Sequence, residues 1–153
     1  MVYEPFRFPA KGCFPLAILV FVFLIALLLD TCVSKEVVAR ATSPDGKVVA
    51  RLYEINGGAT TDFRYSVQLS RKWPRWDHEA ASLYGAVRSN CAYGLNMRWR
   101  DDRTLELEYL EAKKTTFDRS LSVAGKEISI VLRAGVNDER AACGGMLYNL
   151  QGG

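Results

Sequence analysis

Apolar and polar positions divide this chain into two parts, and the first is a single apolar run near the N-terminus. Residues 13–29 (CFPLAILVFVFLIALLL) contain no charged side chain. As a helix they would extend about 25 Å, at the short end of what a bilayer core requires. Pro15 would lie in the first turn, where a missing N–H is tolerated. We therefore expect one transmembrane helix over residues 13–31, preceded by a cytoplasmic tail at residues 1–12.

The residues that flank this run predict its orientation. Arg7 and Lys11 precede it with only Glu4 against them, whereas the charges that follow are balanced. The positive-inside rule then places the N-terminus in the cytoplasm and the remaining chain in the periplasm or outside the cell. We expect a single-pass protein of the inner, or cytoplasmic, membrane.

The end of the run predicts that the helix is retained as an anchor. A leader peptidase requires small residues at the −3 and −1 positions, and Leu29-Asp30-Thr31 does not supply them. Cys32 leaves a lipoprotein open as an alternative, in which the cysteine is acylated. The residues before Cys32 differ from the Leu-Ala-Gly that such sites resemble.

Beyond the anchor, strict alternation of apolar and polar residues predicts β-strands, most clearly in FRYSVQLS at residues 63–70. Residues 95–100 and 105–109 alternate in the same way around Asp101-Asp102, which predicts a hairpin. Its polar side would carry Arg98 and Arg100 opposite Glu106 and Glu108. The remaining expected strands are residues 36–42, 47–55 and 127–133.

These strands predict a mainly β fold, a small antiparallel sheet domain that is a sandwich or an open barrel, over residues 33–135. The turn Ser43-Pro44-Asp45-Gly46 between the first two strands suits a type I turn. Residues 78–87 have a short helix as an alternative. We expect residues 136–153 to be a partly irregular C-terminal extension.

Composition narrows the possible partners. The net charge of +3 over 153 residues is not concentrated in a Lys/Arg block, so nucleic acid is not an expected partner.

Cys91 and Cys143 are the two cysteines of the expected exported domain, and an oxidising compartment favours a disulfide between them. Two buried free cysteines are the alternative. Their spacing excludes a C-x-x-C redox motif and a zinc knuckle, and we expect no cofactor or metal.

Three short motifs resemble an uncharacterised bacterial family, known as a domain of unknown function. SPDGK at residues 43–47 is followed by GGATT at residues 57–61, and WRDDRTL at residues 99–105 resembles that family's tryptophan-turn-strand element. The resemblance covers residues 37–109. It implies an N-terminal membrane segment joined to a small exported domain, and it implies no activity.

Two loops are candidate binding sites. In the first, Gly57, Gly58, Ala59, Thr60, Thr61 and Asp62 combine backbone freedom with hydroxyl and carboxylate groups that can bind a ligand or partner. A simple strand connection explains the same residues. The second loop mixes cations with indoles, which suits a membrane surface, although a solvated loop is the alternative. Its residues are Arg71, Lys72, Trp73, Arg75 and Trp76.

His78 is the only histidine, so a Ser–His or Cys–His hydrolase would have to use it, with Cys91 or Ser82 as nucleophile. No nucleophile elbow or second metal ligand accompanies it, and an exposed loop histidine is the simpler interpretation. We therefore expect a non-catalytic, membrane-anchored envelope domain that binds a protein or surface partner. An exported hydrolase using His78 and a lipoprotein anchored at Cys32 are the alternatives.

Overall fold

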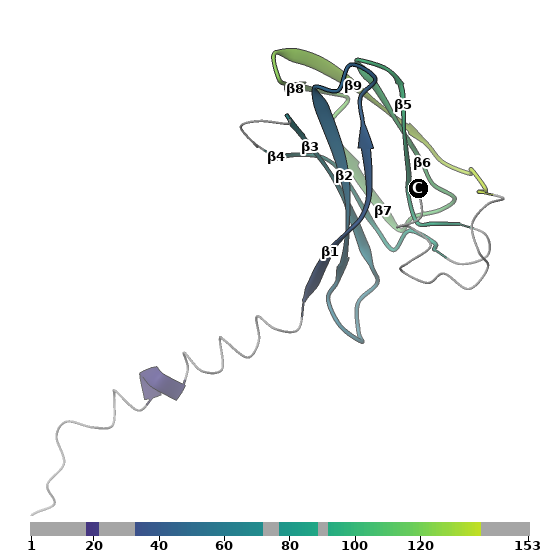
Figure 1. Cartoon of the computed structure of the whole chain (residues 1–153). Helices are drawn as coiled ribbons and strands as arrows, with labels where there is room; N and C mark the ends of the chain where they lie inside the picture. Colours follow the sequence, from purple (N-terminus) through teal and green to yellow (C-terminus); the bar gives the residue numbers. More distant parts are fainter. Residues whose placement is uncertain (1–17, 22–32, 72–76, 89–91, 139–153) are drawn as a thin grey trace, which may run out of the picture. The chain divides into compact units, whose positions relative to one another are not determined.

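The structure of the chain is a computed structural model, which describes residues 18–21, 33–71, 77–88 and 92–138. The chain forms two units, residues 1–32 and 33–153. In the first unit, residues 18–21 are helical (Figure 1). Within the described ranges no helix has both the length and the apolar character needed to cross a membrane. The rest of the helix expected over residues 13–31 lies outside the described residues.

The second unit is a β-domain whose strands form two sheets (Figure 1). The five-stranded sheet has the order β1-β2-β3-β4-β7, and the four-stranded sheet has the order β5-β6-β9-β8. The strands are β1 (Ser34–Thr42), β2 (Val48–Asn56), β3 (Arg64–Arg71), β4 (Asp77–Tyr84), β5 (Asn96–Asp101), β6 (Thr104–Glu108), β7 (Lys114–Phe117), β8 (Ser120–Val123) and β9 (Lys126–Arg133). The expectation of a mainly β fold is confirmed.

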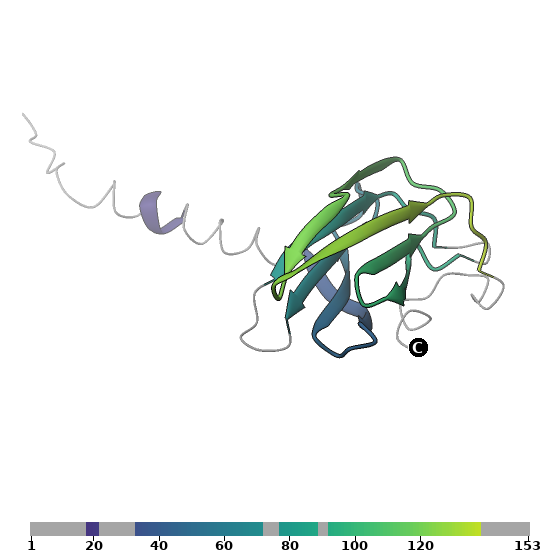
Figure 2. The ribbon, with the colours of Figure 1, turned by 90° about the horizontal axis from the view of Figure 1, so that it is seen from above.

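Alternation places one face of each sheet in a shared core. On β3, Tyr65, Val67 and Leu69 are fully buried, as are Leu105 and Leu107 on β6. All five belong to one apolar cluster that draws on both sheets. Figures 1 and 2 show the strands in two layers, so the domain is a sandwich.

The strands expected from alternation are confirmed, with ends that differ by one or two residues. Residues 77–84 form strand β4 between β3 and β7, so the alternative of a short helix in this segment is wrong. Its Glu, Ala and Leu residues favour helix, but pairing on both sides overrides that weak preference. Strands β7 and β8 were not expected, because each has only four residues.

One strand pair departs from the expected antiparallel arrangement. Strands β6 and β9 pair in parallel, from Thr104 opposite Ser129 to Glu108 opposite Arg133. Parallel neighbours need a long connection, and residues 109–125 supply it by passing through β7 in the other sheet and β8 at the sheet edge. The four-stranded sheet is therefore mixed, and the five-stranded sheet is antiparallel throughout.

A tight hairpin joins β8 to β9 through two residues, Ala124 and Gly125. Their φ angles are 55° and 73°. Both lie in the left-handed region that a type I′ hairpin turn requires at its two central positions. Gly125 adopts it freely, whereas Ala124 is the only non-glycine residue with positive φ in the described part of the chain.

Candidate binding surfaces

The turn at residues 43–46 joins β1 to β2 at one end of the sandwich. Its side chains and backbone contact the four-stranded sheet. Its closing hydrogen bond runs from the Gly46 N–H to the Ser43 carbonyl, at 2.8 Å. The Asp45 N–H donates to Asp102 Oδ1 in the β5–β6 turn, at 2.8 Å. The Asp45 carboxylate accepts a hydrogen bond from the Lys126 ammonium at the start of β9. Through Asp45, this turn therefore contacts both the β5–β6 turn and the β8–β9 hairpin of the four-stranded sheet.

The same contacts favour the ionised form of the Asp45 carboxyl group. The hydrogen bond from Lys126, assisted by one of 2.8 Å from Ser43, lowers the pKa of Asp45 to about 2. Nearby, Trp99 Nε1 on β5 donates to the Ala41 carbonyl on β1 at 3.1 Å. SPDGK and WRDDRTL, two of the motifs that carry the family resemblance, therefore meet in space. Their contacts are structural ones between the sheets.

A cleft of about 310 Å³ opens at this same end, between the close of β3, the start of β4 and the β8–β9 hairpin. Its lining residues are Arg71, His78, Ser122, Val123, Ala124 and Gly125. Arg71 and His78 are exposed, and no acidic residue is found among the described residues that line the cleft. Asp77, which precedes His78, has its carboxylate 3.5 Å from the Arg51 guanidinium. The cleft therefore presents a cation and an imidazole beside a strand edge.

The geometry around His78 separates it from one of its expected catalytic partners. Ser82 lies four residues further along β4, which is about 13 Å at the rise of an extended strand. A serine–histidine pair needs a direct hydrogen bond of about 3 Å. The other expected nucleophile, Cys91, lies outside the described residues.

The loop at residues 57–62 joins β2 to β3 at the opposite end of the five-stranded sheet. Asn56 Oδ1 accepts the Gly58 N–H at 2.9 Å, and the Thr61 N–H donates to the Gly58 carbonyl at 3.2 Å. The Asp62 carboxylate pairs with Lys113 Nζ at 2.6 Å. These bonds give Gly58, Thr61 and Asp62 a structural role in the loop. Ala59 and Thr60 stay exposed, and a ligand at this loop remains a prediction.

The remaining predicted sites fall mainly on residues that the structure does not describe. Arg71 ends β3, whereas Lys72, Trp73, Arg75 and Trp76 of the expected membrane-surface loop lie outside the described residues. So do both cysteines of the expected disulfide, Cys91 and Cys143. All of these assignments stay predictions.

The polar face of the four-stranded sheet holds an arginine cluster around one buried carboxylate. Glu106 has a fully buried side chain and accepts hydrogen bonds from Arg98, Arg100 and Arg133 at 2.6–3.0 Å. The hydrogen bonds from Arg100, followed by those from Arg133 and Arg98, lower the pKa of Glu106 to about 2. Glu108 accepts from Arg98 at 3.3 Å. The predicted pairing of Arg98 and Arg100 with Glu106 is confirmed, and Arg133 is an additional partner from β9.

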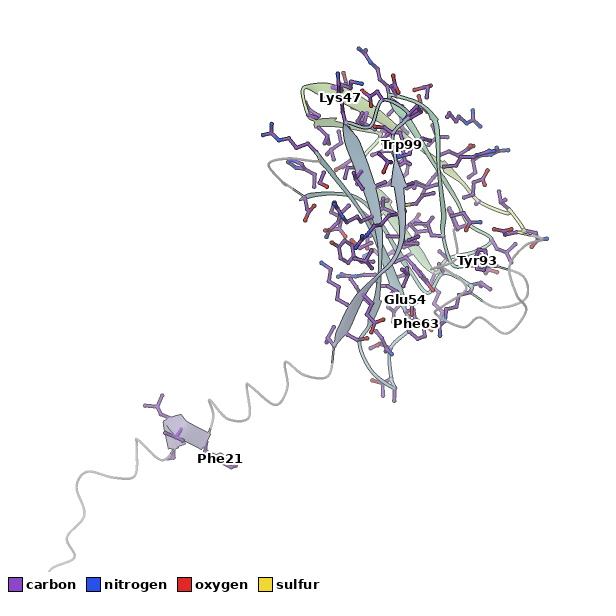
Figure 3. All side chains as sticks on the ribbon, viewed as in Figure 1. Phe21, Lys47, Glu54, Phe63, Tyr93 and Trp99 are labelled. Atoms are coloured by element: carbon purple, nitrogen blue, oxygen red, sulfur yellow. The ribbon has the colours of Figure 1, made fainter. Side chains whose placement is uncertain are left out.

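A second buried network was not apparent from the sequence. Glu54 on β2 points into the core, where it accepts a hydrogen bond of 2.7 Å from Tyr65 Oη and two bonds of 2.9 and 3.1 Å from Arg88. The Arg88 guanidinium also lies over the Phe63 ring, 4.0 Å from its centroid. Burial, and then the hydrogen bond to Glu54, raises the pKa of Tyr65. Figure 3 labels Glu54 and Phe63 at the end opposite Lys47 and Trp99.

Gly94 shows how closely the chain after β4 covers this network. A Cβ atom at residue 94 would lie 2.5 Å from the Tyr65 ring, and the φ angle of Gly94 is 85°. Only glycine fits both the contact and the backbone conformation. Close contact with the Tyr65 ring therefore requires glycine at residue 94.

Comparisons with protein families, characterised proteins and solved structures return no match for this chain. Within the described ranges, no three His, Cys, Asp or Glu side chains form a group that could hold a metal ion. A functional assignment therefore depends on the surfaces described above.

Proposed function

We propose that this chain is a single-pass envelope protein, anchored by residues 13–31, whose exported β-sandwich binds a partner protein without catalysis. The apolar run at residues 13–29 and the charges around it support the anchor and the orientation. The exposed edge of β8, beside the cleft that contains Arg71 and His78, supports binding of a partner.

The composition of the sheet edges carries this proposal. Strands β1, β5, β7 and β8 lie at the ends of the two sheets. Charged residues on an edge strand discourage pairing with another chain, and β1, β5 and β7 all contain them. The edge strand β8 reads Ser-Leu-Ser-Val and contains none. An extended segment of a partner can hydrogen-bond along β8, and the cleft then receives its side chains.

A matched pair of substitutions tests this surface. Ser122→Lys places a charge on the β8 edge, whereas Ser129→Lys places the same charge on β9, which has a neighbouring strand on each side. We expect an affinity-tagged full chain to retain a defined envelope protein in the wild type and in Ser129→Lys, and to lose it in Ser122→Lys. Equal retention by all three proteins would contradict binding at β8.

Anchoring and topology are tested separately. We expect the full chain to resist extraction by carbonate, and a reporter fused to the C-terminus to be active only outside the cytoplasm. Acylation of Cys32 would instead add the mass of its acyl groups to the intact protein.

The position of His78 in the cleft is the observation that favours the alternative of a hydrolase. Full cellular function in His78→Ala would exclude that alternative.

A further inference from the structure

One line of cross-strand neighbours on the outer face of the five-stranded sheet carries only positive charge. Lys35 pairs with Ile55, Ile55 with Arg64, Arg64 with Tyr84, and Tyr84 with Lys114. Cross-strand partners point to the same face, so these five side chains lie side by side. We call them the cationic row. It crosses all five strands and is about 19 Å long at the usual strand spacing.

No ion pair with a described residue neutralises the charges of the row. Arg64 and Lys114 are exposed and form no ion pair with any residue that the structure describes. The Lys35 ammonium lies 4.4 Å from the centroid of the Tyr53 ring, a contact that leaves its charge in place. Three cations therefore lie along one row with apolar or aromatic residues between them.

The nearest carboxylates do not oppose the row. Glu36 follows Lys35 on β1, and alternation directs it to the other face of the sheet. Asp62 is already paired with Lys113 at 2.6 Å. The next line on the same face consists of Val37, Tyr53, Ser66, Ser82 and Thr116. The Glu79 carboxylate reaches this line, where it accepts a hydrogen bond of 2.7 Å from the Ser66 hydroxyl.

The row lies at the end of the sheet where the chain enters it. Lys35 is the second residue of β1, and the β2–β3 hairpin turns at this same end (Figure 1). Four residues separate Leu29, the last residue of the apolar run, from Ser34, and a fully extended chain between these two residues spans at most about 18 Å. Two side chains here are partly apolar and exposed, Val33 at 55% and Tyr84 at 36%.

We propose that the cationic row lies against the phosphate groups of anionic phospholipids in the membrane that holds the anchor. This inference rests on the anchor proposed above. The short connection holds the row near the headgroups, where a cation is attracted to an anionic surface, and Tyr84 has the amphipathic character that suits such an interface. Strand β3 is about 23 Å long, so the cleft at its far end then faces away from the bilayer.

The test uses the full chain in nanodiscs of phosphatidylcholine, with or without phosphatidylglycerol, and a small fraction of lipid that carries a paramagnetic headgroup. We expect the amide signals of Arg64 and Lys114 to broaden only when phosphatidylglycerol is present. The amide signal of Lys47, at the far end, should stay sharp. Raising the salt from 0.05 to 1 M shortens the Debye length to about 3 Å and should remove the broadening.

Two charge-matched triple variants identify the surface. Lys35→Gln/Arg64→Gln/Lys114→Gln should abolish the broadening, because each cation near an anionic surface strengthens association about fivefold. The control removes three exposed cations elsewhere and should broaden as the wild type does. It is Arg40→Gln/Lys47→Gln/Arg103→Gln.

The outcomes of these experiments test the role of the row separately from the proposed membrane anchor. Broadening that is absent, or that survives in the first triple variant, would refute the role of the row while a carbonate-resistant chain leaves the anchor standing. Loss of the captured partner protein, with unchanged lipid broadening, would assign the row to that protein and also refute the inference. A chain that carbonate extracts would refute both the anchor and the orientation that depends on it.

Discussion

Substitution of Arg88 by methionine should destabilise the domain strongly, because it removes the cation that pairs with the buried Glu54 carboxylate. The Glu54 side chain is 2% exposed, and Arg88 Nη1 lies 2.9 Å from its Oε1. Removing one partner of a buried pair typically costs 3–5 kcal/mol, because the other charge stays in the protein interior. The Arg88 side chain is 24% exposed, so water can approach, and we expect a loss of about 3 kcal/mol.

Two further variants separate the loss of charge from the loss of packing on Phe63. Glu54→Gln keeps an acceptor for Tyr65 Oη and removes the negative charge. In the double variant with Arg88→Met, it should recover about 1–2 kcal/mol of the lost stability. Arg64→Met replaces an exposed arginine on the same sheet and should change stability by less than about 0.5 kcal/mol.

Urea denaturation of the full chain in mild detergent, followed by tryptophan fluorescence, gives the free energies of unfolding. A loss below about 1 kcal/mol in Arg88→Met would mean that Glu54 does not depend on Arg88 for its charge. A double variant no more stable than Arg88→Met would assign the loss to packing on Phe63 instead. Either result would refute the network as the electrostatic support of the chain after β4.

Three further predictions follow from the pKa shifts and the hairpin turn. The carboxyl groups of Asp45 and Glu106 have pKa values of about 2 in the folded chain, below their ordinary 3.8 and 4.5, so urea stability should be level near neutral pH and fall as the pH drops from about 5 to 2. The raised pKa of Tyr65 should lower stability above pH 10, and Tyr65→Phe should remove that alkaline loss in the same assay. Ala124→Asn should raise the unfolding free energy by about 1 kcal/mol, because asparagine tolerates positive φ, and an unchanged urea midpoint would contradict strain at this turn.

The strands that alternate strictly were predictable, because a period of two reports burial of one face. Residues 63–70 and the hairpin of β5 and β6 are examples. Strand β4 was harder to predict, since its residues favour helix locally and only the neighbours β3 and β7 make it a strand. The parallel pairing of β6 with β9 depends on a long connection, which no local pattern reveals.

The side-chain contacts also divide into those that local sequence predicts and those that depend on distant strands. Arg98, Arg100 and Glu106 were predictable as a cross-strand group because the turn at Asp101-Asp102 sets their register. Arg133 completes the cluster from a strand that is distant in sequence. The contacts of Glu54 were hidden for another reason, since a glutamate in an alternating strand is usually placed on the wet face.

The cationic row depends on the registers of four strand pairs at once, so no local pattern in the sequence brings its residues together. Lys35, Arg64 and Lys114 lie far apart along the chain and belong to no charged run. A slip of one residue in the pairing of β2 with β3 would turn Arg64 toward the core and Tyr65 outward. The buried Tyr65–Glu54 hydrogen bond opposes that slip, because both groups would lose their partner. The network at the inner face therefore favours the β2–β3 register that places Arg64 on the outer face, in line with Ile55.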